Sequence, residues 1–159
     1  MKTQILKTVL ALFVSVLLVG CSEDDSNDNN TNNNSNLIAQ ANQVAQSGSW
    51  RISYFWDTDK DETSNFAGYV FNFNSDGTLV ATGNNNTVNG TWSVTDSSSS
   101  SSSSSNDVDF NIFFNVPQTS DFEDLNDDWD IISITNNMME LTDVSGGNGG
   151  TDFLTFVKN

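Results

Sequence analysis

The stretch YVFNFNSDGTLVAT, residues 69–82, decides the fold. Every second position from Tyr69 to Phe73 is aromatic, and this period of two is typical of a strand with one buried face. The Asp76-Gly77 pair that follows favours the positive φ of a tight hairpin turn. The stretch therefore predicts two antiparallel strands that fold directly back on one another.

The same period of two recurs on both sides of this hairpin. Before it, Trp50, Ile52 and Tyr54 alternate with polar residues, and after it the short Asn136-Asn137 pair separates two further alternating runs. Strands joined by short links favour a meander whose last strand returns to the first. We therefore expect an all-β domain over residues 48–159, a small eight-stranded antiparallel up-and-down barrel. Its strands are expected at 50–54, 69–73, 78–82, 88–94, 108–114, 129–135, 138–142 and 153–158.

The residues before the barrel divide into two parts. Residues 21–36 are polar, acidic and rich in Asn, and they predict a disordered tether because they offer little apolar surface to bury. In residues 37–47, apolar side chains recur at near-helical spacing, which predicts a short helix that covers one end of the barrel. Inside the barrel, the nine serines of Ser97–Ser105 predict a flexible loop.

The first residues of the chain predict export and a lipid anchor. Lys2 and Lys7 precede an apolar run of the length of a signal-peptide core, which predicts a signal peptide over residues 1–20. Leu18-Val19-Gly20-Cys21 resembles the lipobox of bacterial lipoproteins, which implies cleavage before Cys21 and acylation of its sulfur. Two or three acyl chains give a stable membrane anchor.

The residues directly after Cys21 predict where the exported protein resides. Ser22-Glu23-Asp24-Asp25 resembles an acidic export signal that, in one group of Gram-negative bacteria, sends lipoproteins to the outer face of the outer membrane. We expect a lipid-anchored outer-membrane protein exposed on the cell surface. A periplasm-facing anchor is the alternative, since any solvated tether can carry a few acids.

The barrel region resembles the lipocalin-like domain of small bacterial lipoproteins. The resemblance rests on an ordered set of motifs, and it implies a binding module rather than an enzyme. The chain differs from animal lipocalins in being shorter and in having no disulfide. The motifs are Gly48-Ser49-Trp50, the 71–78 hairpin, Gly90-Thr91-Trp92 and Leu154-Thr155-Phe156.

The composition of the chain argues against nucleic-acid binding and against catalysis. Removal of residues 1–20 takes away Lys2 and Lys7 and leaves three cations against 21 acids, a formal net charge of −18. Such a chain has no basic cluster with which to bind nucleic acid. It contains no His and no Cys besides Cys21, so the usual bases and nucleophiles of catalysis are missing. We expect no enzymatic activity, and a small apolar ligand, a glycan or an envelope protein as the partner.

Two acidic segments are candidate contact sites. Asp57, Asp59 and Asp61 alternate as in a calcium loop, although Glu62 stands where an EF-hand needs Gly. The second segment, residues 121–130, contributes Asp124, Asp127 and Asp128. In a meander the first and fifth links lie at the same end, so the two segments could converge on Ca²⁺ or a basic partner. The alternative is two solvated acidic runs, with no cofactor.

Three functional hypotheses follow. The first is a binding module with a ligand inside a hollow barrel. The second is an envelope structural or partner-binding module, which predicts a packed barrel and adjacent acidic links. The third, a carboxylate-dependent glycosidase, requires two acids that face each other across a cleft. Phe55 and Trp56, at the end of the first strand, are the candidates for an aromatic contact surface.

Overall fold

The computed structural model describes residues 29–97, 108–144 and 150–159. The predicted signal peptide, Cys21 and Ser98–Ser105 of the serine run lie outside these residues. The described elements are α1 (Asn29–Ala45), β1 (Ser49–Asp57), β2 (Lys60–Asp61), the short 3-10 helix η1 (Thr63–Phe66), β3 (Val70–Phe73), β4 (Thr78–Gly83), β5 (Asn86–Asp96), β6 (Val108–Phe114), β7 (Asp127–Thr135), β8 (Met138–Val144) and β9 (Thr151–Lys158).

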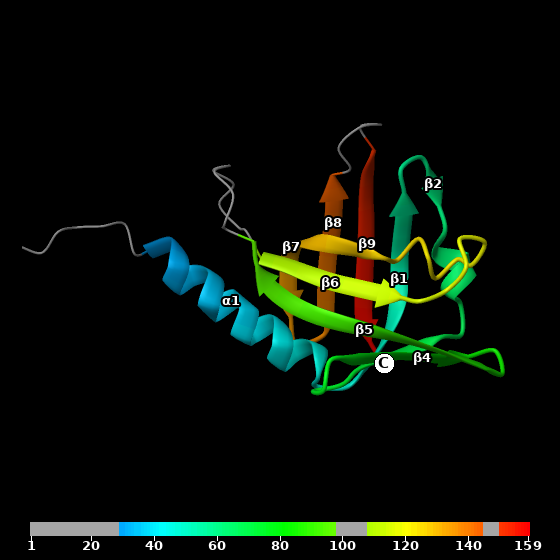
Figure 1. Cartoon of the computed structure of the whole chain (residues 1–159), viewed down its shortest axis with the longest axis horizontal. Coiled ribbons are helices and arrows are strands. Elements are labelled where there is room, and N and C mark those ends of the chain that lie inside the picture. Colours follow the sequence, from blue (N-terminus) through cyan, green and yellow to red (C-terminus); the bar gives the residue numbers. More distant parts are fainter. Residues whose placement is uncertain (1–28, 98–107, 145–149) are drawn as a thin grey trace, which may run out of the picture.

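Eight of the strands form a closed antiparallel barrel in sequence order (Figure 1). Each strand from β3 to β9 pairs with its chain neighbour, and β1 pairs with both β3 and β9, which closes the ring. The two-residue β2 adds to the free end of β1 through the pairs Trp56↔Asp61 and Asp57↔Lys60. The predicted eight-stranded up-and-down barrel is confirmed, and β2 is an addition that the sequence did not predict.

The tight turns use the residues that their geometry requires. Gly77, in the turn between β3 and β4, has a φ of 83°, as the Asp-Gly pair predicted. In the turn between β4 and β5, Asn84 and Asn85 have φ values of 52° and 60°. Asn adopts this left-handed region more readily than other side chains, so the turn can be two residues long.

Aromatic side chains fill the interior of the barrel. Phe71 packs edge-to-face on Phe156 with ring centroids 5.3 Å apart, and Phe73 packs on Phe110 at 5.5 Å and on Phe156 at 5.4 Å. These rings come from β3, β6 and β9, so they meet across the barrel rather than along one strand. Trp50, Trp92 and Trp129 are buried as expected. The described interior is a packed core, which disfavours the hollow-barrel hypothesis.

A β-bulge in β1 corrects two expectations. The register between β1 and β9 shifts between Ile52 and Tyr54, so the alternation changes phase at Ser53. Tyr54 was expected inside but is 40% exposed, whereas Phe55, expected at the surface, is fully buried against Phe66 and Trp129. The prediction of Phe55 as an aromatic contact residue is therefore wrong.

Helix α1 begins at Asn29, inside the segment that the sequence predicted as a tether. Tertiary contacts explain the difference, because the buried Asn34 donates a hydrogen bond from Nδ2 to Asp96 Oδ1 at 3.2 Å. Further along the helix, Ala41 and Ala45 are buried against the barrel, and the Trp50 indole donates to the carbonyl of Ala45 at 2.8 Å. The helix covers one end of the barrel as predicted, in contact with β5, β6 and β7.

The barrel therefore has two different ends. At the helix end, covered by α1, β5 ends and β6 begins. At the opposite end lie the link between β1 and β3 (residues 58–69) and the link between β6 and β7 (residues 115–126). Figure 1 shows α1 on the left of the view and these two links on the right. Among the described residues, no helix has the length and apolar character needed to cross a membrane.

Candidate functional site at the acidic end of the barrel

The two links opposite α1 pack against each other through aromatic rings. Phe122 in the second link lies edge-to-face on Phe66, with centroids 5.5 Å apart, and on Tyr69 at 5.0 Å. Phe66 and Phe122 are both buried. This apolar contact holds the acidic residues of the two links beside one another, as the meander order predicted.

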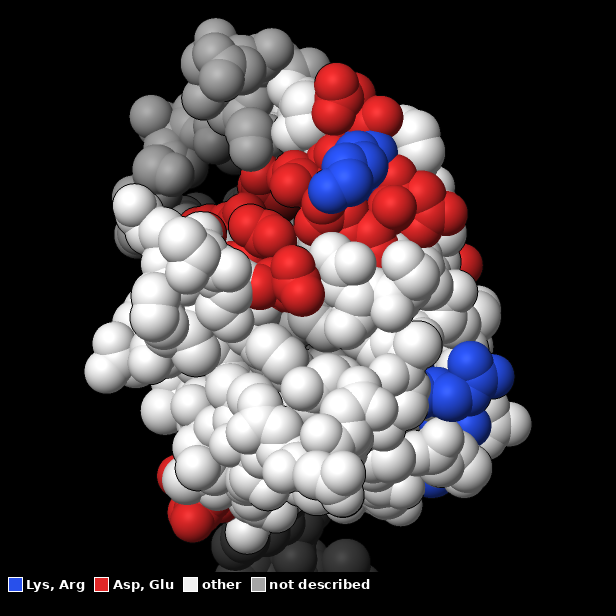
Figure 2. All heavy atoms as spheres, turned by 90° about the vertical axis from the view of Figure 1, so that its right-hand side faces the viewer, with Lys and Arg blue, Asp and Glu red and all other residues white. Residues whose placement is uncertain are grey.

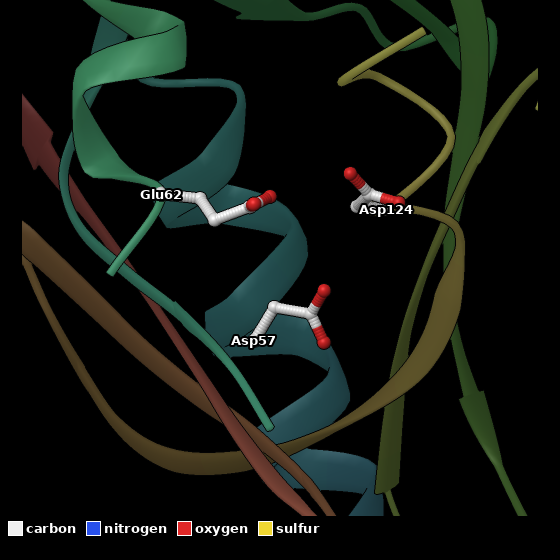
Figure 3. Close-up of side chains that lie close together, drawn as sticks. All are labelled: Asp57, Glu62 and Asp124. Atoms are coloured by element: carbon white, nitrogen blue, oxygen red, sulfur yellow. The ribbon is translucent and has the colours of Figure 1, made fainter. Parts of the chain in front are cut away.

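Three carboxylates from these segments form a cluster, which we call the acidic cluster. Asp57 comes from the end of β1, Glu62 from the first link and Asp124 from the second, and one oxygen of each lies within 4.8 Å of the others. Figure 3 shows the three side chains turned toward a common point. Of the sequence-predicted residues, the structure brings Asp57 and Asp124 together.

Glu62 was not among the predicted site residues, yet it is the most buried member of the cluster, with 7% of its surface exposed. Its backbone N–H donates to the carbonyl of Phe55 at 3.0 Å, and its carboxylate forms an ion pair with Lys60. A signal was present in the sequence: Lys60 and Glu62 are two residues apart, and in an extended segment such residues share a face.

Repulsion and partial burial change the titration of the cluster. The pKa of Asp124 is raised to about 6, first because the carboxyl is partly removed from water and then because Glu62 and Asp57 are close. Burial also raises the pKa of Asp57, and Asp152 on β9 adds to this effect. Lys60 is the counterion, since its hydrogen bond and ion pair with Glu62 raise the pKa of the ammonium group.

The other predicted acids lie outside the acidic cluster. Asp59 is exposed, and Asp61 uses its carboxylate to accept the backbone N–H of Thr63 at 3.0 Å. Asp127 and Asp128 belong to β7 instead of the link before it. Burial raises the pKa of Asp127 to about 6, and the side-chain hydrogen bond with Asp128 contributes to the rise.

Negative charge nevertheless covers the whole end of the barrel. Figure 2 shows acidic side chains gathered at one end of the molecule, around a basic side chain. Besides the cluster, the loops and strand ends at this end carry Asp59, Asp61, Asp121, Glu123, Asp127, Asp128, Asp143 and Asp152, against Lys60. We call this surface the acidic end.

Of the two predicted aromatic contact residues, only Trp56 reaches the surface. Its ring is half-buried, and its indole N–H donates to the carbonyl of Thr58 at 3.1 Å. Phe153 on β9 pairs directly with Trp56 and is 37% exposed, so it belongs to the same patch. This neighbour could not be predicted from the residues around Trp56, because the contact depends on closure of the barrel by β9.

The acidic cluster has the donors of a hard-cation site. Calcium takes six to eight oxygen ligands, and three carboxylates can supply up to six. The same oxygens also suit the ammonium or guanidinium group of a partner protein. Lys60 already neutralises part of the charge, so either cation would compete with it or share Glu62 with it.

Comparisons with known proteins give a similar solved structure but no family. No family model matches the chain, and no curated protein matches it. Among solved structures, the chain is similar to the crystal structure of a DUF4847 family protein from Bacteroides vulgatus ATCC 8482. The two are 18% identical, the alignment covers 75% of this chain and 97% of that one, and the TM-score is 0.47.

Proposed function

We propose that this chain is a non-enzymatic lipoprotein of the bacterial cell envelope, anchored through Cys21, whose lipocalin-like barrel binds a cationic partner at the acidic end. The observation that carries the proposal is the convergence of Asp57, Glu62 and Asp124 from two distant links. Carboxylates that crowd together in the folded state repel one another, and a cation that binds there relieves the repulsion.

The packed interior favours a surface partner over an internal ligand. Rings from β3, β6 and β9 contact one another across the barrel, and an apolar ligand would have to displace them. The adjacent acidic links are the second feature that the partner-binding hypothesis required.

The proposed anchor at Cys21 favours the same surface, because it precedes α1. Helix α1 begins at Asn29, and Asn34 contacts Asp96 at the helix end of the barrel. The chain from Cys21 to Asn29 spans at most about 28 Å when extended. An anchor at Cys21 would therefore join the domain through the start of α1, which favours a partner surface at the opposite, acidic end.

The glycosidase hypothesis gains no support from the structure. Its two acids would have to face each other across a cleft that holds a sugar. A groove between β1, η1 and β3 is lined by none of the clustered carboxylates.

A lysine-rich peptide with a fluorescent label tests the proposed partner surface. We expect salt-sensitive binding in an anisotropy titration, and a two- to fivefold weakening, roughly one surface charge pair, in Asp124→Asn. Asp76→Asn is the matched control, because Asp76 lies in the β3–β4 turn at the helix end and the amide oxygen can still accept from Thr78. Equal losses in both variants would contradict a specific acidic end.

A divalent cation is the second candidate for the acidic cluster, favoured by the three oxygens within 4.8 Å. Calcium at millimolar concentration should then raise the melting temperature of the parent and of Asp76→Asn, and should do so less in Asp124→Asn. If calcium leaves the melting temperature of the parent unchanged, the divalent-cation site is contradicted. The peptide-binding test does not depend on that result. Intact-mass measurement of the mature protein checks acylation at Cys21.

A further inference from the structure

A groove of about 440 Å³ opens on the wall of the barrel between β1, η1 and β3. It exists because β1 pairs with β3 at only two positions, Ser49↔Asn72 and Trp50↔Phe71. Beyond Trp50 the two strands separate, and the link from η1 to β3 crosses the gap. The volume is within the range of small-molecule sites.

The walls of the groove are held in place by contacts on each side. Phe66, which is buried, packs edge-to-face on Phe55 with centroids 5.6 Å apart. The backbone N–H of Phe55 donates to Thr63 Oγ1 at 2.8 Å, which ties η1 to β1. On the other side, Asn84 Nδ2 donates to the carbonyl of Ala67 at 3.0 Å. The groove is therefore formed before any ligand arrives, which lowers the entropic cost of binding.

The polar groups of the groove are unusual for this chain. Arg51 lines it and is exposed, and it is one of the three cations that follow Cys21. Within the described residues, its guanidinium group has neither an ion pair nor a side-chain hydrogen bond. The lining contains no Asp or Glu, although the chain has 21 of them.

The remaining lining residues complete a site for a small polar molecule. Ser53 and Ser64 bring hydroxyl groups, and the Tyr69 ring, held edge-to-face against Phe122, forms a wall. The Arg guanidinium matches the oxygens of a carboxylate or phosphate with two parallel hydrogen bonds.

We propose that this groove binds a small organic anion whose carboxylate or phosphate oxygens pair with Arg51 and whose body lies against Tyr69 and the hydroxyl side chains. The groove shares the first link with the acidic end, but none of the three clustered carboxylates lines it, and its proposed ligand has the opposite charge.

The net charge of the protein does not forbid an anionic ligand. Charges interact over a screening length of about 8 Å at physiological salt. Asp61 and Glu62 directly precede the lining residue Thr63 on the first link, whereas Arg51 lines the groove from β1. Arg51 carries the only charged side chain of the lining, so it is the group that would pair with an anion.

Calorimetric titration of the full chain with three probes tests the proposal. Glucuronate carries a carboxylate, glucose 6-phosphate carries a phosphate, and glucose carries neither. We expect at least one of the two anions to bind below about 10 mM, and glucose to bind at least tenfold more weakly. The anion that binds more tightly shows whether the groove prefers a carboxylate or a phosphate.

Variants connect the binding to the groove. Arg51→Gln should weaken the anion at least about tenfold, and Arg51→Lys should weaken it less, because an ammonium keeps the charge but loses the planar fork. Ala67→Trp tests shape, since a large ring on this exposed lining residue should block the groove with Arg51 intact. Lys158→Gln removes the same charge outside the lining and should leave the affinity unchanged.

Three results would overturn the proposal. Neither anion binds with a dissociation constant below about 10 mM, glucose binds as tightly as the anions, or Arg51→Gln binds the anion as tightly as the parent does. Thermal unfolding of each variant shows whether it is folded. Asp124→Asn, which removes a charge from the acidic cluster, should leave anion binding within about twofold of the parent, so the two proposed sites succeed or fail separately.

Discussion

The bulge at Ser53 determines which side chains of β1 reach the core. Before it Trp50 and Ile52 point inward, and after it Phe55 does so while Tyr54 is exposed. Phe55 then contacts Phe66 on η1 and Trp129 on β7, so one side chain joins three elements. Its neighbour Trp56 is half-buried at the barrel rim.

Truncation of these neighbours should have unequal effects. Phe55→Ala should lower the free energy of unfolding by about 3–5 kcal/mol, because it removes a fully buried ring and leaves a cavity. Trp56→Ala should cost about 1 kcal/mol or less, since its ring is only half-buried. Urea unfolding of both variants measures the difference. A larger loss in Trp56→Ala would contradict the bulged register.

At the residue scale, the sequence predicted most of the core but failed at the bulge. Strict alternation correctly placed Phe71 and Phe73 inside, because their strand follows one register throughout. A bulge adds one residue without any compositional mark, so alternation assigned the wrong face to Tyr54 and Phe55. Glu62 was missed for a similar reason, because its burial depends on a link that folds back on β1.

Among the elements, helix α1 begins earlier than its sequence predicts, because tertiary contacts stabilise its first half. Its apolar residues occupy the second half of the helix, which the sequence predicted. The first half is mostly Asn, a poor helix former, and its start could not be predicted from propensity. The buried Asn34 accounts for the extension, since its hydrogen bond to Asp96 holds the first half of the helix against β5.

Charge on the buried face of α1 should release the helix from the barrel. Ala41→Asp places a carboxylate at a fully buried position and should lower the free energy of unfolding by about 2–4 kcal/mol. Gln43→Asp adds the same charge to the exposed face of the same helix and should change stability by less than about 0.5 kcal/mol. Chemical unfolding of the pair provides the measurement, and similar losses in both would argue against the docked helix.

The strands were the most predictable elements. Each has a period of two, and several are bounded by turn residues with a defined conformational preference, such as Gly77 and Asn84-Asn85. Strand β2 was not predicted, because a strand of two residues is too short to show a period of two. The convergence of the acidic links was predictable as well, because a meander fixes which links share an end of the barrel.

For the whole molecule, charge at the acidic end makes stability depend on pH. In the folded protein the pKa values of Asp124 and Asp127 are raised to about 6, from the ordinary value of 3.8. Between these values the folded state binds more protons than the unfolded state, so stability falls as pH rises from about 4 to above 6. Below that window Asp61 and Asp76, whose pKa values are lowered, lose their stabilising hydrogen bonds.

The melting temperature should therefore be highest near pH 4 and fall by about 2–5 °C by pH 7.5. Differential scanning calorimetry across this range gives the profile. Asp124→Asn should reduce the fall, because an amide does not ionise, and Asp76→Asn should leave the fall above pH 5 as it is. A melting temperature that rises from pH 5 to 7.5 would contradict the raised pKa values.

Closure of the barrel by β1 and β9 sets the order in which the chain can complete its fold. These strands stand at opposite ends of the domain sequence, yet they share six residue pairs. During synthesis, β1 therefore waits for its partner until Lys158 has been added, and pairing over so long a sequence separation is slow. A chain that stops before β9 leaves two unpaired strand edges, on β1 and β8, which are templates for aggregation.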